Sequence, residues 1–312
     1  MGEMRSPPRA LLALIPATVV AVASCGGGEP RVSSPASPEV RSPRAPARCA
    51  SDTAESEPSS AVPGTAASEP DRTGFQRLQV RWAEAAGLDY LEIVAGDVDP
   101  DAPLPLVLGL HGLGDKPRVP EDARLGDGIP YRIVMPRAPE PSGHHGYTWL
   151  PVRVRDGKVG VLCESLRERA ELLAEFLRAV RRQRPTVGRP VVTGGSQGGM
   201  LTFTLAVHHP DVVAAAVPVM GWLPPPLVPE GVEDAEAYPP IYAVHGEADR
   251  VIPVDLDREG VDALQRLGLD VRFETYEGVG HHMTAAMDEQ VQTWLARMLR
   301  AQLATGRRPA WH

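Results

Sequence analysis

The sequence predicts an α/β fold with a mostly parallel central sheet, and three observations lead to this prediction. Strand-like and helix-like segments alternate from residue 74 onward. Residues 104–110 (LPLVLGL) form a continuous apolar run, as in strands that are buried on both faces. The chain has 312 residues, of which 43% are hydrophobic and 23% charged, so it can bury a substantial core.

The predicted strands begin at residue 75. Residues 75–84 and 89–94 predict an antiparallel pair, because a Gly-containing turn at 85–87 separates them. The later strands are short, largely apolar runs bounded by turn residues, which is typical of buried strands. They are expected at residues 104–110, 131–135, 191–193, 212–220, 241–244 and 271–276.

The longest predicted helix covers residues 161–184. Its apolar residues recur at helical spacing with charges on the opposite face, and it ends before Pro185. Further helices are expected at residues 199–208, 255–267 and 284–303. Residues 137–160 are expected to form a loop that holds Tyr147 and Trp149. Together these elements predict a folded domain over residues 74–305.

The N-terminal residues 1–24 have the layout of an export signal. Arg5 and Arg9 precede the apolar run LLALIPATVVAVA, which is too short for a permanent membrane-spanning helix. The run ends in Val-Ala-Ser-Cys25 followed by three glycines, and this resembles the lipobox of bacterial lipoproteins. The resemblance implies that Cys25 becomes a lipidated N-terminus. It would anchor an exported protein to a membrane, at the periplasmic face or the cell surface. A plain secretory signal is the alternative.

Two further segments are expected to lie outside the folded domain. Residues 25–73 consist largely of Pro, Ser, Ala and Glu, and they carry too little apolar surface to offset the entropy of ordering. They predict a disordered tether, and residues 306–312 predict a flexible tail.

Charge and cysteine content argue against two classes of protein, nucleic-acid-binding proteins and disulfide-stabilised scaffolds. The net charge of −8 leaves no basic footprint for a nucleic-acid partner. Only three cysteines occur, Cys25, Cys49 and Cys163, which argues against a disulfide scaffold. A Cys49–Cys163 disulfide and two free thiols both remain open.

The stretch 191–200, VVTGGSQGGM, carries the strongest chemical signal. Residues 194–198 fit the G-x-S-x-G pattern of a nucleophile elbow, in which a strand turns sharply into a helix and presents a serine. Glycines flank Ser196 because the turn strains the backbone and leaves no room for side chains. A glycine-rich turn that merely closes a strand is the alternative.

A nucleophilic serine needs a base and an acid that orients this base. Asp249 follows the predicted strand 241–244 in a Gly-containing turn, and it is the acid candidate ahead of Glu247. His281 follows the last predicted strand and is preceded by a glycine that lets the loop fold back over the serine. The adjacent His282 is the alternative base, and otherwise a residue that lines the substrate site.

Backbone amides are the candidates for an oxyanion hole. The sequence HGLGD at 111–115 follows the strand 104–110, and its glycines let the Leu113 amide turn toward the serine. The second donor is expected to be the amide of Gln197. Asp115 precedes the serine in the chain and is treated as structural. Trp149 and Trp222 are candidates for lining the substrate site, and packing is the alternative for both.

No metal or other cofactor is expected. Adjacent histidines occur at 144–145, 208–209 and 281–282, but neighbouring side chains do not share a face, and no HExxH or CxxC spacing accompanies them.

Five motifs together resemble the phospholipase/carboxylesterase family of small α/β-hydrolases, which includes acyl-protein thioesterases. They are HGLGD (111–115), GGSQGG (194–199), MGWLP (220–224), HGEADRVIP (245–253) and EGVGHH (277–282). The resemblance covers roughly residues 104–303. It implies an α/β-hydrolase fold without a large cap domain, and a cofactor-free serine esterase. Residue matching places Ser196, Asp249 and His281 in the triad, with backbone donors at Leu113 and Gln197.

The acyl preference stays open, because the sequence departs from the family before its long helix. Family members usually have Ser-Trp-Phe-Asp there, and this chain has Thr-Trp-Leu-Pro at 148–151. The expected function is hydrolysis of short to medium acyl esters, small-molecule or lipid-like, through an acyl-enzyme. A polyester depolymerase, a lysophospholipase, a thioesterase and a peptidase are alternatives on the same fold. A non-catalytic surface-binding lipoprotein is the alternative of another class. The sequence does not indicate an oligomeric state.

Overall fold

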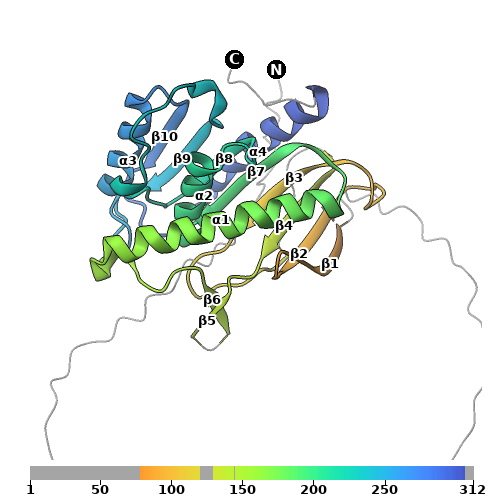
Figure 1. Cartoon of the computed structure of the whole chain (residues 1–312), viewed down its shortest axis with the longest axis horizontal. Helices are drawn as coiled ribbons and strands as arrows, with labels where there is room; N and C mark the ends of the chain where they lie inside the picture. The colour runs from red at the N-terminus through yellow and green to blue at the C-terminus, as the bar shows by residue number, and fades with distance from the viewer. Residues whose placement is uncertain (1–77, 120–128, 144, 306–312) are drawn as a thin grey trace, which may run out of the picture. The chain divides into compact units, whose positions relative to one another are not determined.

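A computed structural model of the protein describes residues 78–119, 129–143 and 145–305 (Figure 1). All of them belong to one of the two units into which the chain divides, and the other unit, Val22–Gly74, lies outside the described residues. The predicted signal, the predicted lipidation site Cys25, the predicted tether and tail, and Cys49 lie outside them as well. Cys163 is buried with a free thiol.

The described residues form a mostly parallel sheet of eight strands, in the order β1-β2-β4-β3-β7-β8-β9-β10. The predicted antiparallel pair at its edge is confirmed, since β1 pairs with β2 antiparallel, and β2 also pairs antiparallel with β4. All other neighbours in the sheet are parallel. The strands are β1 (Leu78–Ala85), β2 (Leu88–Ala95), β3 (Leu104–Leu110), β4 (Tyr131–Pro136), β7 (Thr186–Gly195), β8 (Ala215–Val219), β9 (Ile241–Gly246) and β10 (Val271–Tyr276).

Helices cover both faces of this sheet. The helices α1 (Val159–Gln183), α2 (Gln197–His208) and α3 (Val254–Arg266) share one core cluster with the sheet, and α4 (Ala285–Thr305) shares the other. In Figure 1, α1 runs across the front of the sheet. Its inner face is apolar at helical spacing, whereas α2 is buried almost all round because it packs against α1, β7 and β8.

Two strands predicted within the described residues begin at least three residues away from their start in the structure. The strand predicted at 191–193 begins earlier, at Thr186, because a register shift against β3 between Pro105 and Val107 accommodates the turn-like sequence before it. The strand predicted at 212–220 begins later, at Ala215. Val212 and Val213 are buried without belonging to the strand, so apolarity alone could not place its start.

The segment predicted as a plain loop, residues 137–160, is partly ordered. It contains a hairpin of β5 (Glu140–Ser142) and β6 (Gly146–Thr148), followed by the 3-10 helix η1 (Val154–Asp156). Strands of three residues are too short to show an alternating pattern, which is why the sequence did not reveal them. Between β8 and β9 the described chain forms only the 3-10 turns η2 (Pro225–Leu227) and η3 (Ala235–Ala237). No cap domain is inserted there.

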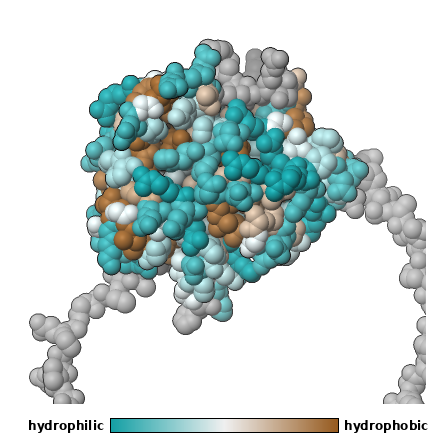
Figure 2. Space-filling model, viewed as in Figure 1, coloured by the Kyte–Doolittle hydropathy of each residue, from teal (hydrophilic) through white to brown (hydrophobic). Residues whose placement is uncertain are grey.

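Hydrophobic side chains form separate patches among hydrophilic ones on the face shown in Figure 2. The most exposed large hydrophobic side chain of the described residues is Trp82 on the edge strand β1, at 56%. None of the helices in the described part of the chain is both long enough and apolar enough to cross a bilayer.

Candidate active site

Ser196 occupies a sharp turn between β7 and α2. Its φ of 57° and ψ of −117° place a non-glycine residue in a strained conformation. The turn needs glycine on its helical side, because a Cβ atom on Gly198 would lie 2.2 Å from the Leu110 carbonyl oxygen. A Cβ atom on Gly199 would lie 2.6 Å from the Val219 carbonyl oxygen. The serine is therefore presented at the carboxyl edge of the sheet, between the ends of β3 and β8.

Replacing Gly198 with alanine is expected to lower the free energy of unfolding by about 1 to 3 kcal/mol or more, because the added methyl group overpacks the turn. Thermal or urea unfolding measures the loss. Gly160→Ala is a matched control, since Gly160 lies in α1 with open space around its Cβ position. That variant is expected to be neutral or slightly stabilising. Equal losses in the two variants would contradict this account of the turn.

The structure brings Ser196, His281 and Asp249 together. His281 Nδ1 donates to Asp249 Oδ2 at 2.5 Å, and this leaves Nε2 to accept the hydroxyl proton of Ser196 at 3.0 Å. Asp249 follows β9, and His281 follows the neighbouring parallel strand β10, so both loops leave the same edge of the sheet as Ser196. A hydroxyl bonded in this way can be activated as a nucleophile by the imidazole.

The Asp249 carboxylate is buried and receives hydrogen bonds at both oxygens. Its Oδ1 accepts from the backbone N–H groups of Val251, at 2.8 Å, and Ile252, at 3.0 Å. Its Oδ2 faces His281 Nδ1 and His245 Nε2, the latter at 3.2 Å. Burial alone would raise the pKa of Asp249, but hydrogen bonds from His245 and His281 outweigh it and hold the pKa well below its usual range. The carboxylate is ionised at neutral pH.

The alternative acid and base lie elsewhere. His282 is exposed, and the structure joins the ring of its neighbour His281, not its own, to Ser196 and Asp249. Glu247 is exposed and accepts a hydrogen bond from Thr275 Oγ1 at 2.7 Å. The geometry therefore selects His281 and Asp249 from the pairs that the sequence left open.

The loop after β3 touches the serine. A Cβ atom on Gly112 would lie 3.5 Å from both Gly195 O and Ser196 Cβ. The hairpin braces this loop through two backbone bonds, from Gly114 N–H to Tyr147 O at 2.8 Å and from Tyr147 N–H to Asp115 O at 2.9 Å. Neither bond uses the Leu113 amide. The Gln197 amide belongs to the first residue of α2, where backbone N–H groups have no partner within the helix.

Sequence reasoning missed a second role for Gln197, through its side chain. Gln197 Oε1 accepts from Thr148 Oγ1 at 3.0 Å and from the Trp149 backbone N–H at 3.1 Å. The Trp149 indole in turn donates to the His111 carbonyl at 3.1 Å. These bonds tie the start of α2 to the hairpin and to the loop after β3. No local sequence pattern indicates them, because they join residues 38 to 49 positions apart.

The three residues expected to line a substrate site differ in exposure. Trp149 is 0% exposed and Trp222 is 5% exposed, and both belong to the core, whereas His282 lies on the surface. In this structure Trp149 offers no surface to a substrate, and its contacts are those of a residue that supports the loop. Within the described ranges, no group of three or more His, Cys, Asp or Glu residues could hold a metal ion.

A serine, an aspartate and a histidine in this chain order, joined at the carboxyl edge of a mostly parallel sheet, define the class of the α/β-hydrolases. The family model for Phospholipase/Carboxylesterase matches residues 88–299. The chain belongs to this family, as the five sequence motifs predicted, and it is a hydrolase.

Relatives and solved structures agree with this class. A probable carboxylesterase of Oryza sativa subsp. japonica is 28% identical over 215 residues, which cover 62% of this chain and 78% of the relative. Acyl-protein thioesterase 1 of Gibberella zeae is 24% identical, over 62% of this chain and 90% of its own. The crystal structure of esterase PE8 matches with a TM-score of 0.54 at 23% identity, covering 70% of this chain and 98% of its own. TT1662 from Thermus thermophilus matches with a TM-score of 0.53 at 21% identity, covering 70% and 97%. The two structures show the shared fold.

Proposed function

We propose that the protein hydrolyses short to medium acyl carboxylic esters through an acyl-enzyme on Ser196. The observation that carries this proposal is the continuous hydrogen-bonded chain from Ser196 Oγ through His281 to Asp249. Nε2 of His281 accepts the hydroxyl proton as Oγ attacks the ester carbonyl. Asp249 holds the ring in the tautomer that this step needs and stabilises the imidazolium that it creates.

The developing oxyanion is held by backbone amides. The Leu113 and Gln197 N–H groups are the donors in this proposal, because both belong to segments that lie beside Ser196. The imidazolium of His281 gives its proton to the leaving alcohol, which departs as the C–O bond breaks. A water molecule then attacks the acyl carbonyl, His281 takes its proton, and Ser196 Oγ leaves with that proton to restore the free enzyme.

Thioesters are a second candidate substrate class. Several relatives are named acyl-protein thioesterases, and the same serine chemistry acts on an ester or a thioester carbonyl.

The described chain between β8 and β9 contains only short 3-10 turns, and this supports a site that is not closed by an inserted domain.

A substrate panel tests the proposal. We expect turnover of p-nitrophenyl esters with a maximum at a short or medium chain, an initial burst, and a mass increase of one acyl group on Ser196. One acyl thioester, one lysophospholipid, one polyester film and one peptide ester with its amide analogue cover the alternatives. Turnover confined to one of these would replace simple esters by that class. If no acyl substrate is turned over and Ser196 is not acylated, a non-catalytic binding protein would be the remaining interpretation.

We also propose that the chain is an exported lipoprotein anchored to a membrane through Cys25. The apolar run after Arg5 and Arg9 and the Val-Ala-Ser-Cys-Gly sequence support this proposal. Expression in a bacterium should give a membrane-associated mature chain that begins at Cys25 with the added mass of its acyl groups. A Cys25→Ser variant with the same membrane fraction and mature mass would contradict it.

A further inference from the structure

A second histidine–aspartate pair lies directly behind the triad. His245, the fifth residue of β9, and Asp257, in the first turn of α3, are both 0% exposed. His245 Nδ1 lies 2.7 Å from Asp257 Oδ2. On the other side of the ring, Nε2 lies 2.9 Å from the Ile252 carbonyl oxygen and 3.2 Å from Asp249 Oδ2. The imidazole is thus placed between the triad aspartate and a second carboxylate.

The partners of this ring determine where its protons lie. Nε2 faces only acceptors, a carbonyl oxygen and a carboxylate oxygen, so it carries a hydrogen. Nδ1 faces the Asp257 carboxyl group, and a hydrogen bond at 2.7 Å requires one proton between them. Burial lowers the pKa of His245, but hydrogen bonds to Asp249 and Asp257 outweigh it and raise the pKa to about 9. Burial raises the pKa of Asp257 as well, so the two groups compete for the proton between Nδ1 and Oδ2, and the raised pKa of His245 assigns this proton to the ring at neutral pH.

Among the described residues, the hydrogen-bond partner of the Asp257 side chain is His245. Asp257 Oδ1 is buried and makes no hydrogen bond with any described residue, so the polar contacts of this side chain go to His245. A buried carboxyl group that serves one imidazole is costly to keep unless this contact matters.

We propose that His245 is a positioning residue for the hydrolytic reaction. It holds the Asp249 carboxylate in the orientation that His281 needs, and Asp257 holds His245 in its doubly protonated form. This inference rests on the function proposed above for Ser196, His281 and Asp249.

Two consequences follow for the reaction. The Nε2–H of His245 donates to the Ile252 carbonyl, and Nε2 lies 3.2 Å from the Asp249 oxygen that accepts from His281. Loss of His245 therefore removes one of the contacts that fix this oxygen, while the backbone N–H groups of Val251 and Ile252 still hold the other. The His245 cation also offsets part of the negative charge beside His281. Four groups set this charge balance: Asp249 in the loop after β9, His281 in the loop after β10, and Asp257 with the neighbouring cation Arg258 on α3.

Two substitutions of His245 separate the effect of its hydrogen-bond geometry from the effect of its charge. In His245→Gln the amide nitrogen reaches the place of Nε2, where it can still donate to the Ile252 carbonyl and lie beside the Asp249 carboxylate, whereas in His245→Asn it reaches only the place of Nδ1. We expect His245→Asn to lower kcat about 10²-fold with little change in KM, because a carboxylate displaced by about 1 Å misplaces His281. His245→Gln should recover most of this loss. In both variants the acid limb of the kcat/KM profile should move to higher pH, by about one unit, because a cation has been removed.

His208→Asn is the matched control. His208 donates from Nε2 to the Leu227 carbonyl at 3.0 Å, and it lies about 17 Å along α2 from the nucleophile. It should leave kcat and the pH profile unchanged. If His245→Asn and His245→Gln retain wild-type kcat and pH profile, or lose the same activity as each other, the positioning role is overturned.

Two further measurements complete the test. Should the His245 variants not fold, ¹⁵N spectra of the histidines in the wild-type protein decide, with both ring nitrogens of His245 protonated at pH 7 as the expected result. An unprotonated ring nitrogen would overturn the inference. Labelling of Ser196 with a fluorophosphonate tests the proposed function separately. If wild type does not label, that function fails, whereas a labelled wild type with unaltered His245 variants means that only the inference fails.

Discussion

Replacing Ser196 with alanine is expected to reduce kcat by about 10⁶-fold toward any ester that the wild-type enzyme hydrolyses. The variant lacks the hydroxyl group that lies 3.0 Å from His281 Nε2, while the backbone amides beside it remain. KM should change little for the same reason. Initial rates with a p-nitrophenyl ester measure the loss, and a fluorophosphonate probe should label wild type and leave Ser196→Ala unlabelled.

Three companion variants sharpen this result. His281→Ala should lose activity to a similar extent, and Ser196→Ala/His281→Ala should lose no more than either single variant, because the two residues act as one unit. His282→Ala is the matched control, since it removes the neighbouring exposed imidazole. An inactive His282→Ala beside an active His281→Ala would show that the choice of His281 as the base is wrong.

The three triad residues could be predicted because each of them follows a local pattern in the sequence. Ser196 is fixed by a local glycine pattern, and the other two members follow strands that the apolar runs 241–244 and 271–276 revealed. Parallel strands bring their carboxyl ends to one edge of a sheet, so residues far apart in sequence converge there. Chain order then placed the acid and the base after the serine, and the contacts in the structure selected Asp249 and His281 from the neighbouring candidates.

Contacts between side chains of different elements could not be predicted in this way. His245 lies inside β9, in a motif whose pattern indicates a role only for Asp249. Its partner Asp257 has the position of an ordinary acidic residue in the first turn of a helix. Their contact depends on how α3 packs against the sheet. The Gln197 side chain and the hairpin β5–β6 are similar cases, because each is defined by partners that the sequence places dozens of residues away.

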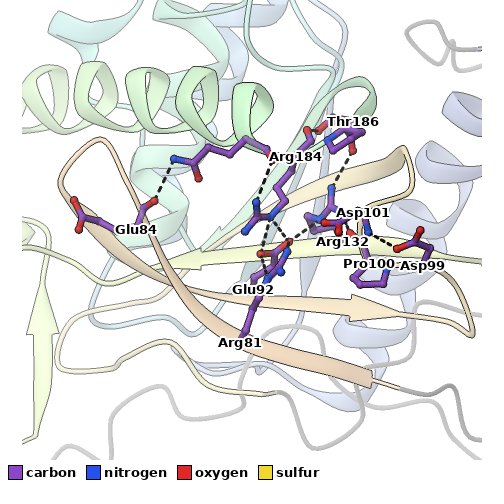
Figure 3. Close-up of polar contacts among 11 residues, drawn as sticks. Arg81, Glu84, Glu92, Asp99, Pro100, Asp101, Arg132, Arg184 and Thr186 are labelled. Carbon is purple, nitrogen blue, oxygen red and sulfur yellow. Dashed lines mark hydrogen bonds and ion pairs between the residues drawn. The ribbon is translucent and has the colours of Figure 1, made fainter.

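A buried ion cluster at the other edge of the sheet is the second place where one substitution should have a large effect. Glu92 on β2 has a side chain that is 1% exposed, and three guanidinium groups surround its carboxylate (Figure 3). Arg81 lies at 2.7 Å, the fully buried Arg132 at 2.8 Å and Arg184 at 3.1 Å. Arg132 also donates to the Pro185 carbonyl at 2.9 Å, so the cluster joins β1, β2 and β4 to the start of β7.

Replacing Glu92 with glutamine is expected to lower the free energy of unfolding by about 3 to 5 kcal/mol at pH 7, because it leaves the fully buried cation Arg132 without its counter-charge. Burial alone would raise the pKa of Glu92, but hydrogen bonds from Arg81 and Arg184 outweigh it and lower the pKa. A carboxyl group whose pKa is lower in the folded state stabilises the fold above its unfolded pKa of about 4.3. This contribution is lost as the pH falls through the folded value. The difference between wild type and Glu92→Gln should therefore be full at pH 7 and shrink in acid.

Asp89→Asn gives the matched control on the same strand. Asp89 pairs with Arg137, but their side chains are 48% and 39% exposed, so the loss should be below about 1 kcal/mol. The double variant Glu92→Leu/Arg132→Met should recover much of the stability that Glu92→Gln loses, because it removes the most buried cation together with its partner. Arg81 and Arg184 can then turn their charged ends to water along their partly exposed stems. Equal losses for Glu92→Gln and Asp89→Asn in urea unfolding would mean that the buried cluster is no more important to the fold than a surface ion pair.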